Sequence, residues 1–482
     1  MKPPTTGPEV DSFYHLADVE MTHRRCRGLA CFAAQAQDRA GWSAAVAQWP
    51  PVYCLGKCYA APASTETLAE PTIQAYCDDP IILDGVADGS ARSIEAYVAR
   101  GGYQALSKAR KGEPAAIIEA VESSQLRGRG GAGFPAGRKW RAVFNEPGPT
   151  KYVVANADEG DHGSYIDRYV MERTPHRLIE AMAIAAHAIG AKQGYIYLRK
   201  EYPAAHVSLV AAIEEARDAG VLGERFDLEI VIGQGSYVCG EETSLLNSIE
   251  HRRPEVRARP PFPTAAGLFG KPTLVNNVET FASVPWIVDR GGDAYAARGF
   301  SKSRGTKAVS LSSLFNRPGL YEVEFGVPLR MIIEEIGGGL KTTAPKAVII
   351  GGPLAGVIHP SEFDTPFGFE EMASIGAAIG HGGIVAFDES TSMSRLLAHV
   401  FAFGAIESCG KCTPCRLGSR ELEGLFVKVA NGEPLNADER GLVKATLQAM
   451  LDTSLCGHGS GLAIFANSVF AKYGEELDSC FA

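Results

Sequence analysis

The chain has 482 residues, of which 45% are hydrophobic and 21% are charged, so its composition excludes a disordered or fibrous protein. Its formal net charge of −9 argues against a general binder of nucleic acid or of anionic membranes. No apolar run reaches the roughly 18 residues of a membrane helix, and the N-terminus has no hydrophobic signal region. We therefore expect a cytoplasmic protein without a membrane segment, with about three domains.

Helices and strands are predicted to alternate in the middle of the chain. Apolar runs at 152–155, 195–198 and 228–232 predict buried strands. The segments 176–191 and 203–220, which lie between these runs, predict helices. This order predicts a mostly parallel α/β sheet, with ligands bound at the carboxyl ends of its strands.

The regions on either side of this unit have other patterns. Residues 91–125 are predicted to be helical. From about 305 to 390, shorter apolar runs predict a small α+β domain. The chain after 394 is predicted to be helical, with Asn436 and Glu439 spaced as in a capping box at a helix start.

Three cysteines near the C-terminus, Cys409, Cys412 and Cys415, form a C-x2-C-x2-C run. These gaps let one loop wrap three thiolates around a single metal centre, and Cys456 is the expected fourth ligand of a cubane iron–sulfur cluster. The alternatives are a structural zinc site and a redox disulfide. Two paired cysteine knuckles would be more typical of zinc, so the spacing favours a 4Fe–4S cluster.

Four cysteines near the N-terminus form two pairs. Cys26 and Cys31 are spaced C-x4-C, and Cys54 and Cys58 are spaced C-x3-C. Two pairs of thiolates can hold a two-iron cluster, with two thiolates on each iron. Zinc remains the competing interpretation on spacing alone.

A glycine-rich loop begins at Gly128 and contains a literal G-x-G-x-x-G. The segment before it is predicted to be a helix, whereas the dinucleotide fingerprint follows a strand. The backbone N–H groups of such a loop can still hold a phosphate, and Arg129 and Lys139 add positive charge. The alternative is a surface loop with a solvated basic face.

Polar loops follow the first and third predicted strands. The side chains of interest in these loops are Asn156, Asp158, Glu159 and Asp161 in the first, and Tyr237, Glu241 and Glu242 in the second. Acidic clusters on loops are usually only solvated, but two of them at strand ends beside a glycine loop indicate a ligand site. Asn276 and Asn277 add uncharged amides, or else mark a turn.

Over about 110–475 these motifs resemble the NADH-binding flavoprotein subunit of respiratory complex I, of NAD-reducing hydrogenases and of NAD-dependent formate dehydrogenases. The resemblance implies that FMN is held by Gly128, Arg129, Gly130, Lys139, Asn156, Asp158, Glu159, Gly240, Glu241, Asn276 and Asn277. It implies that the NAD site is formed by Phe134, Asp161, Tyr237, Glu242, Arg259 and Phe262. Hydride transfer is then the work of FMN, and no side chain needs to act as catalytic acid or base.

The resemblance also divides the chain into four domains. Residues 1–88 resemble a thioredoxin-like 2Fe–2S domain, although the 22 residues between its cysteine pairs are fewer than in most relatives. Residues 89–304 would form a Rossmann-like domain for FMN and NADH, 305–392 a ubiquitin-like β-grasp domain, and 393–482 a helical bundle with the 4Fe–4S cluster.

The particular complex is suggested by one short segment. The complex I proteins usually have Asp-Glu-Ser-Glu where this chain has Asp158-Glu159-Gly160-Asp161, which more closely resembles the formate dehydrogenase β subunits. The chain is thus expected to be the electron-transfer (diaphorase) subunit of an NAD-dependent formate dehydrogenase, with a molybdopterin-binding catalytic subunit (molybdenum or tungsten) as its partner. The alternative is the NADH-oxidising subunit of complex I or of an NAD-reducing hydrogenase.

Overall fold

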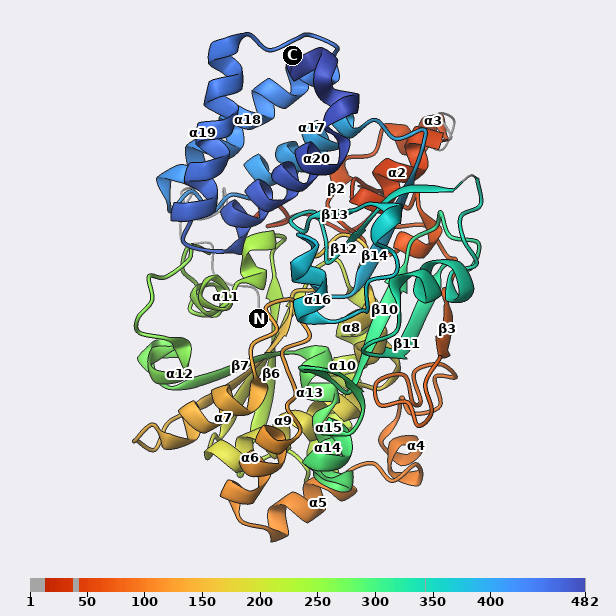
Figure 1. Ribbon diagram of the computed structural model, residues 1–482. Helices are drawn as coiled ribbons and strands as arrows, with labels where there is room; N and C mark the ends of the chain where they lie inside the picture. Colours follow the sequence, from red (N-terminus) through yellow and green to blue (C-terminus); the bar gives the residue numbers. More distant parts are fainter. Residues whose placement is uncertain (1–13, 38–42, 343, 482) are drawn as a thin grey trace.

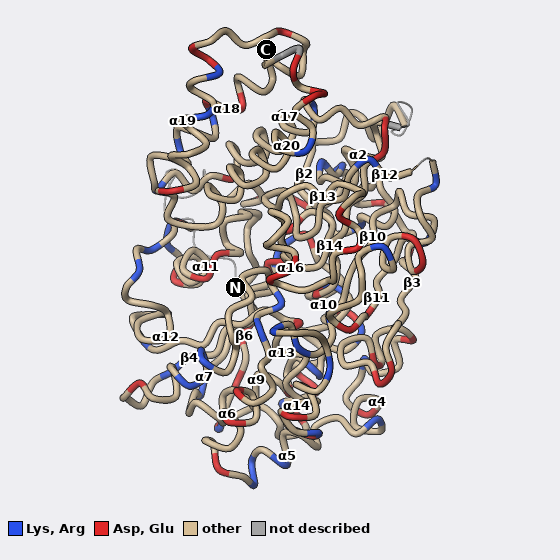
Figure 2. Tube along the Cα trace, in the orientation of Figure 1, with Lys and Arg blue, Asp and Glu red and all other residues tan. Residues whose placement is uncertain are grey.

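The computed structural model describes residues 14–37, 43–342 and 344–481. Figure 1 shows an α/β unit at the bottom, a mixed sheet beside and above it, and a helical bundle at the top. The part of the N-terminal segment that is drawn in red lies beside the bundle and the mixed sheet. Lysines, arginines, aspartates and glutamates are interspersed along the whole trace (Figure 2), as expected for a chain that carries both signs in similar numbers.

The α/β unit contains a four-stranded parallel sheet in the order β6-β5-β4-β7. The strands are β4 (Tyr152–Ala157), β5 (Gln193–Arg199), β6 (Asp227–Gly233) and β7 (Thr273–Asn277). The first three confirm the predicted strands. The fourth contains the asparagine pair, and the register between β4 and β7 pairs Asn156 with Asn277. Two amides that are far apart in the sequence therefore end neighbouring strands.

Helices cover both faces of this sheet. Their bounds are α4 (Ile94–Ala99), α5 (Gln104–Lys111), α6 (Pro114–Ser123), α7 (Ala136–Asn145), α8 (Ile166–Arg173), α9 (Pro175–Ile189), α10 (Pro203–Asp218) and α11 (Glu242–Ile249). The helical region predicted at 91–125 is three short helices, because Gly101-Gly102 and Gly112 interrupt it. The glycine-rich loop follows a helix, α6, as the sequence predicts, and it leads into a second helix, α7, which the sequence analysis does not predict.

The mixed sheet has six strands in the order β13-β12-β14-β10-β11-β3. Five of them come from the region after residue 305: β10 (Thr306–Leu311), β11 (Gly319–Glu324), β12 (Pro345–Ile350), β13 (Val357–Ile358) and β14 (Gly383–Asp388). The sixth, β3 (Thr72–Ala75), comes from the N-terminal segment and pairs in parallel with β11. The N-terminal segment is therefore joined to the rest of the molecule by backbone hydrogen bonds.

Ahead of β3, the N-terminal segment contains little regular structure among its described residues. Two short strands, β1 (Arg25–Cys26) and β2 (Pro51–Val52), pair in parallel, and α2 (Leu29–Gln37) follows the first of them. The buried side chains of this segment, Leu29 and Leu55 among them, belong to the same apolar core as the α/β unit.

The C-terminal region is helical, as predicted. Its four helices are α17 (Met393–Ile406), α18 (Thr413–Ala430), α19 (Ala437–Thr453) and α20 (Gly457–Phe481). The capping box is confirmed: the Asn436 side chain accepts the backbone N–H of Glu439, and the Glu439 carboxylate accepts the backbone N–H of Asn436. In the described part of the chain, no helix combines the length and apolarity that crossing a membrane requires.

Candidate functional site

A cavity of about 400 Å³ lies where the α/β unit, the mixed sheet and the bundle meet. Its wall includes the loops after β4, β6 and β7, the glycine-rich loop, the turns before β14 and after β12, and the first turns of α20. The predicted site residues on the wall are Gly130, Asn156, Asp158, Glu159, Asp161, Tyr237, Gly240, Glu241 and Asn277. Loops from distant parts of the sequence thus converge at the carboxyl end of the parallel sheet.

The glycine-rich loop forms part of the wall with backbone alone. A Cβ added to Gly130 would lie 2.9 Å from the Cβ of Asn277, and Gly131 has a φ of +118°. Gly131 also makes an isolated β-bridge with Gly380, which precedes β14. Side chains at these positions would meet Asn277 and Gly380, so glycine is required for the close approach of the loop to its neighbours.

The two basic residues predicted to hold FMN do not line the cavity. Arg129 is 1% exposed, and its Nη2 donates to the hydroxyl of Tyr295 (2.7 Å) and to the carbonyl of Arg304 (2.6 Å). Lys139 donates from Nζ to Glu242 Oε2 at 2.7 Å and to the carbonyl of Val275. Both side chains connect elements around the site.

Two of the wall carboxylates have ordinary structural partners. Glu159 Oε1 and Oε2 accept the backbone N–H groups of Ile166, Asp167 and Arg168 at the start of α8. Glu241 Oε2 accepts the backbone N–H groups at the start of α11 and so caps that helix. Both carboxylates stabilise a helix N-terminus, where negative charge is favourable.

The other two wall carboxylates are perturbed by burial. Burial raises the pKa of Asp158 well above its usual range, although Arg199 opposes the shift. Burial also raises the pKa of Asp161, which accepts a hydrogen bond of 2.9 Å from the hydroxyl of Tyr237. Perturbed carboxyls that converge in a cavity are typical of a functional site.

The three asparagine side chains predicted to hold FMN have different surroundings. Asn156 donates to the carbonyl of Gly240, and the Asn277 side chain caps α13 (Val278–Ala282). Asn276 is turned away, since its Oδ1 accepts a hydrogen bond from the indole of Trp140. Among these amides, Asn156 and Asn277 are the ones on the wall.

His381 is a wall residue that the sequence motifs do not reveal. It lies between Gly380 and Gly382, just before β14, and its Nε2 is 2.9 Å from Asp167 Oδ2. Burial disfavours the charged ring, but the charge of Asp167 and a hydrogen bond to it prevail and raise the pKa of His381 to about 9. A histidine next to glycines in a sequence carries no signal of this environment, because Asp167 is more than 200 positions away.

The four C-terminal cysteines come together beside this cavity. Cys409, Cys412, Cys415 and Cys456 line one recess, with Cys412 at the start of α18 and Cys456 directly before α20. Burial raises the pKa of Cys415 to about 12 and that of Cys456 to about 11. Four converging thiols suit a cluster that takes four thiolates. The recess and the cavity share Val238, Cys456 and His458, so the two sites adjoin.

The four N-terminal cysteines also converge, and all are fully buried: Cys26, Cys31, Cys54 and Cys58. The sulfurs of Cys54 and Cys58 are 3.5 Å apart. A Cβ added to Gly28 would lie 3.2 Å from the sulfur of Cys54 and 3.5 Å from that of Cys26, which places these two sulfurs on one side of the loop. The donor set therefore suits a two-iron cluster.

An aromatic cluster lies between the N-terminal cysteines and the cavity. The ring of Tyr53, next to Cys54, stacks on His162 with centroids 5.5 Å apart. Phe403 contacts His162 (4.4 Å between centroids) and Tyr237 (5.0 Å). The N-terminal segment, the bundle and the cavity wall are thus packed together through these rings.

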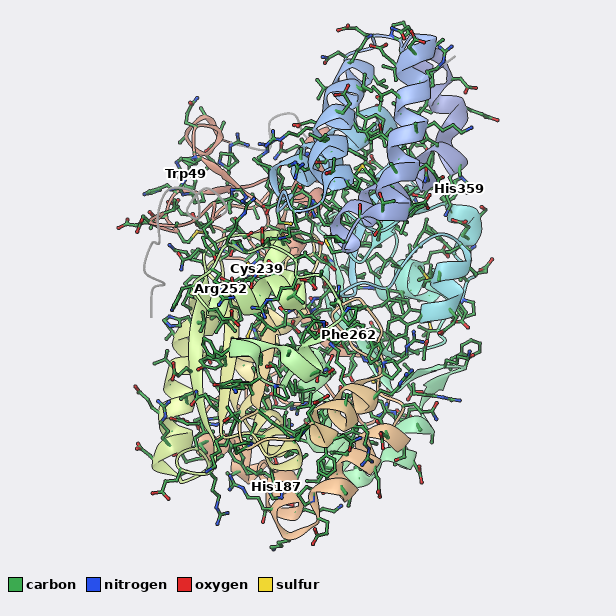
Figure 3. The ribbon with its side chains drawn as sticks, turned by 90° about the vertical axis from the view of Figure 1, so that its left-hand side faces the viewer. Trp49, His187, Cys239, Arg252, Phe262 and His359 are labelled. Atoms are coloured by element: carbon green, nitrogen blue, oxygen red, sulfur yellow. The ribbon has the colours of Figure 1, made fainter. Side chains whose placement is uncertain are left out.

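Two of the predicted NAD residues, Asp161 and Tyr237, line the cavity, whereas the other four, Phe134, Glu242, Arg259 and Phe262, lie outside its wall. Phe134 is 44% exposed and Phe262 is 56% exposed, and the segment from Phe262 through α12 (Pro263–Ala266) packs against α7. Figure 3 labels Phe262 beside this segment. Glu242 pairs with Lys139 at 2.7 Å and with Arg259 at 3.4 Å. Exposed aromatic rings beside a charged pair suit an incoming dinucleotide.

Comparison with known proteins assigns this architecture to a class. Residues 121–286 match the family model described as the Nuo51 FMN-binding domain. Residues 395–480 match the NADH-ubiquinone oxidoreductase-F iron–sulfur binding region. The chain is a flavoprotein component of an NADH oxidoreductase, with an FMN-binding domain and a 4Fe–4S region.

Individual relatives place the chain in a single family. It is 42% identical over 409 residues to the second F-type component of the NADH-quinone oxidoreductase of Rhizobium meliloti (strain 1021), and the match covers 83% of this chain and 97% of the relative. It is 43% identical over 395 residues to HndC of the NADP-reducing hydrogenase of Solidesulfovibrio fructosivorans, covering 80% of each chain. The chain belongs to the NADH-quinone oxidoreductase F-type flavoprotein family.

The solved structures extend the similarity to the N-terminal segment. A chain in the crystal structure of the NAD+-reducing [NiFe]-hydrogenase in the H2-reduced state has a TM-score of 0.83 and 29% identity. The alignment covers 98% of this chain and 87% of that one. The N-terminal cysteines therefore lie in a region that has a structural counterpart in that protein.

Proposed function

We propose that this chain exchanges hydride between NAD(H) and FMN in the cavity and passes single electrons between FMN and the C-terminal 4Fe–4S cluster. The observation that carries the proposal is the shared wall of the two sites. Val238, Cys456 and His458 line both the cavity and the cysteine recess. A cofactor in the cavity is therefore close to a cluster in the recess.

In this proposal, the residues of the cavity bind and orient FMN and the dinucleotide. Bound FMN supplies the chemistry that joins a two-electron hydride step to one-electron steps. Gly130 and Gly131 give its backbone cradle, Asn156 and Asn277 offer amides, and Tyr237 and Asp161 form a hydrogen-bonded pair on the wall. Glu242 positions the dinucleotide through charge, held by Lys139.

The partner is proposed to be a further electron-transfer protein of a complex I-like or hydrogenase-like assembly. Two findings support it: the relatives named as components of NADH-quinone oxidoreductases and hydrogenases, and the hydrogenase chain that aligns with 98% of this one. Neither of these relatives, nor that solved structure, is named as a formate dehydrogenase.

A formate dehydrogenase stays as the second candidate because of the segment Asp158-Glu159-Gly160-Asp161. Copurification of the tagged chain from its source distinguishes the two. A molybdopterin-binding partner with formate-dependent NAD+ reduction would establish the second candidate. A hydrogenase or quinone-reducing partner, with no response to formate, would establish the first.

Cofactor analysis of protein purified without air tests the main proposal. We expect one FMN and about six irons for each chain, from one four-iron and one two-iron cluster, with matching acid-labile sulfide. Addition of NADH should bleach the flavin and cluster absorbance. About four irons with one FMN would restrict the proposal to the C-terminal cluster, and zinc without flavin would contradict it.

A further inference from the structure

The wall of the FMN cavity is rich in acidic groups. Four carboxyl residues line it, namely Asp158, Glu159, Asp161 and Glu241. FMN carries a phosphate with up to two negative charges, and an anion enters such a site only with a compensating positive group. The basic side chains beside the glycine-rich loop, Arg129 and Lys139, do not line the cavity and are bonded to Tyr295 and Glu242.

Among the described wall residues, two are basic: His381 and His458. His458 is bonded from Nε2 to the carbonyl of Gly404, and within the described chain its ring forms no ion pair with a carboxylate. His381 forms such an ion pair with Asp167, at 2.9 Å. The positive charge on the wall therefore belongs to His381.

The ring of His381 is fixed so that one nitrogen is available. The ring nitrogen Nε2 faces Asp167 and lies 3.2 Å from the amide of Asn277. The backbone of His381 is held as well: its N–H donates to Asp161 Oδ2, and its carbonyl accepts a hydrogen bond from Lys307. Nδ1 has no hydrogen-bond partner in the described chain, and the residue lines the cavity. A protonated ring held in this way presents a charged N–H donor to the cavity.

This cluster is not a metal site. Ligand atoms of Glu159, Asp167 and His381 lie within 4.8 Å of one another. However, Glu159 Oε1 and Oε2 already accept three backbone N–H groups and the hydroxyls of Ser164 and Tyr202. A carboxylate with that many donors has little capacity left for a cation.

The position of His381 selects one end of the flavin. Gly380, its neighbour, makes the β-bridge with Gly131 of the glycine-rich loop, so His381 is at the glycine end of the cavity. Another part of the wall is formed by Cys456 and the first turns of α20, next to the cysteine recess. The redox-active ring belongs near this part, because electrons pass between the ring and the cluster, which leaves the glycine end for the phosphate.

We propose that His381 is the cationic ligand of the FMN phosphate and makes the cavity prefer FMN to phosphate-free riboflavin. The inference rests on the proposed flavin site and adds the group that recognises its phosphate. In the flavin-free protein, the charge of the ring is balanced through Nε2 by Asp167, with Glu159 3.6 Å away.

Binding of two flavins to the full-length protein stripped of flavin tests the inference. Dissociation constants for FMN and riboflavin are measured by fluorescence quenching for the wild type, His381→Gln, His381→Lys and Lys139→Gln. We expect His381→Gln to raise the dissociation constant for FMN by about ten- to a hundredfold. The dissociation constant for riboflavin should change less than about threefold. His381→Lys should retain part of the preference for FMN and serves as the deciding variant if His381→Gln does not fold.

The control is His359→Gln, a histidine that caps the short helix Pro360–Glu362 outside the cavity (Figure 3), and it should leave both constants unchanged. An equal loss of both flavins in His381→Gln would mean a structural role and overturn the inference. If Lys139→Gln loses the preference for FMN over riboflavin and His381→Gln keeps it, Lys139 is the ligand of the phosphate. That result would also overturn the inference. A wild type that binds neither flavin would instead overturn the proposed function.

Discussion

At the scale of single residues, charged groups around the cavity act in pairs. Glu242 is held by Lys139 on one side and by Arg259 on the other, at 2.7 and 3.4 Å. These three residues come from α7, α11 and the loop before α12. The pairing fixes a carboxylate between α7, which follows Phe134, and the loop that leads to Phe262, where we expect the dinucleotide.

Replacing Glu242 with Gln should therefore impair NADH turnover and leave cofactor content intact. We expect kcat/KM for NADH, measured with ferricyanide as acceptor, to fall about tenfold or more. The control is Glu122→Gln, which breaks a similar ion pair with Arg141 at 2.7 Å between α6 and α7. Unchanged turnover in Glu242→Gln would refute the placement of that carboxylate.

His381 should also leave a signature in the pH dependence of stability. Its raised pKa, about 9, means that its contribution is fully present below pH about 6.5 and is lost as pH rises through about 9. The groups that face it are Asp167, Glu159, Asp161 and Lys307.

The stability difference between wild type and His381→Gln should thus shrink by about 3 kcal/mol between pH 6 and pH 9.5. Urea unfolding of the flavin-free protein at the two pH values measures it. A difference that stays constant with pH would show that His381 is neutral in the folded protein.

At the scale of elements, local sequence rules account for the helix starts of the bundle. The capping box at α19 satisfies two backbone N–H groups that would otherwise lack a partner. Glu439 also accepts two hydrogen bonds from Lys428 of α18, at 2.8 and 2.9 Å. Glu439 therefore stabilises the N-terminus of α19 and also connects this helix to α18.

Asn436→Ala should destabilise the bundle by about 1 kcal/mol, because it removes the side-chain acceptor of the Glu439 N–H. Thermal unfolding followed by circular dichroism checks this value. The control, Asn467→Ala, changes an exposed asparagine within α20 and should cause no loss. Equal effects of the two substitutions would mean that the cap contributes nothing.

At the scale of the whole molecule, the two cysteine groups lie in different parts of the fold. The N-terminal group belongs to a segment that is joined to the mixed sheet through β3, and the C-terminal group lies at the start of α18 and before α20. Both are near the cavity, through Tyr53 and the ring cluster in one case and through Cys456 in the other.

Single cysteine substitutions should remove the clusters independently. Cys54→Ala should lose about two irons, while Cys412→Ala should lose about four, and both should retain FMN. Iron, sulfide and flavin analysis of the anaerobically purified variants gives the counts. Loss of all iron in either variant would contradict the presence of two separate clusters. Zinc bound in stoichiometric amounts would show that the cysteines hold zinc and not an iron–sulfur cluster.

The sequence by itself determined much of this molecule. Apolar runs predicted β4, β5 and β6, the spacing of Cys409, Cys412 and Cys415 predicted their convergence, and the Asn436 and Glu439 pair predicted a helix start. Each of these follows from interactions between residues close together in the chain. Such interactions depend on spacing, so they can be read from a single sequence.

The tertiary structure decided the rest, because it depends on contacts across hundreds of residues. It turned Arg129, Lys139 and Asn276 toward Tyr295, Glu242 and Trp140, and away from the cavity. It paired β3 with β11, and it placed His381 against Asp167 so that the ring carries a charge. No local sequence pattern encodes which distant side chain will pack against a buried charged group. That contact sets both the orientation of the charged side chain and its pKa.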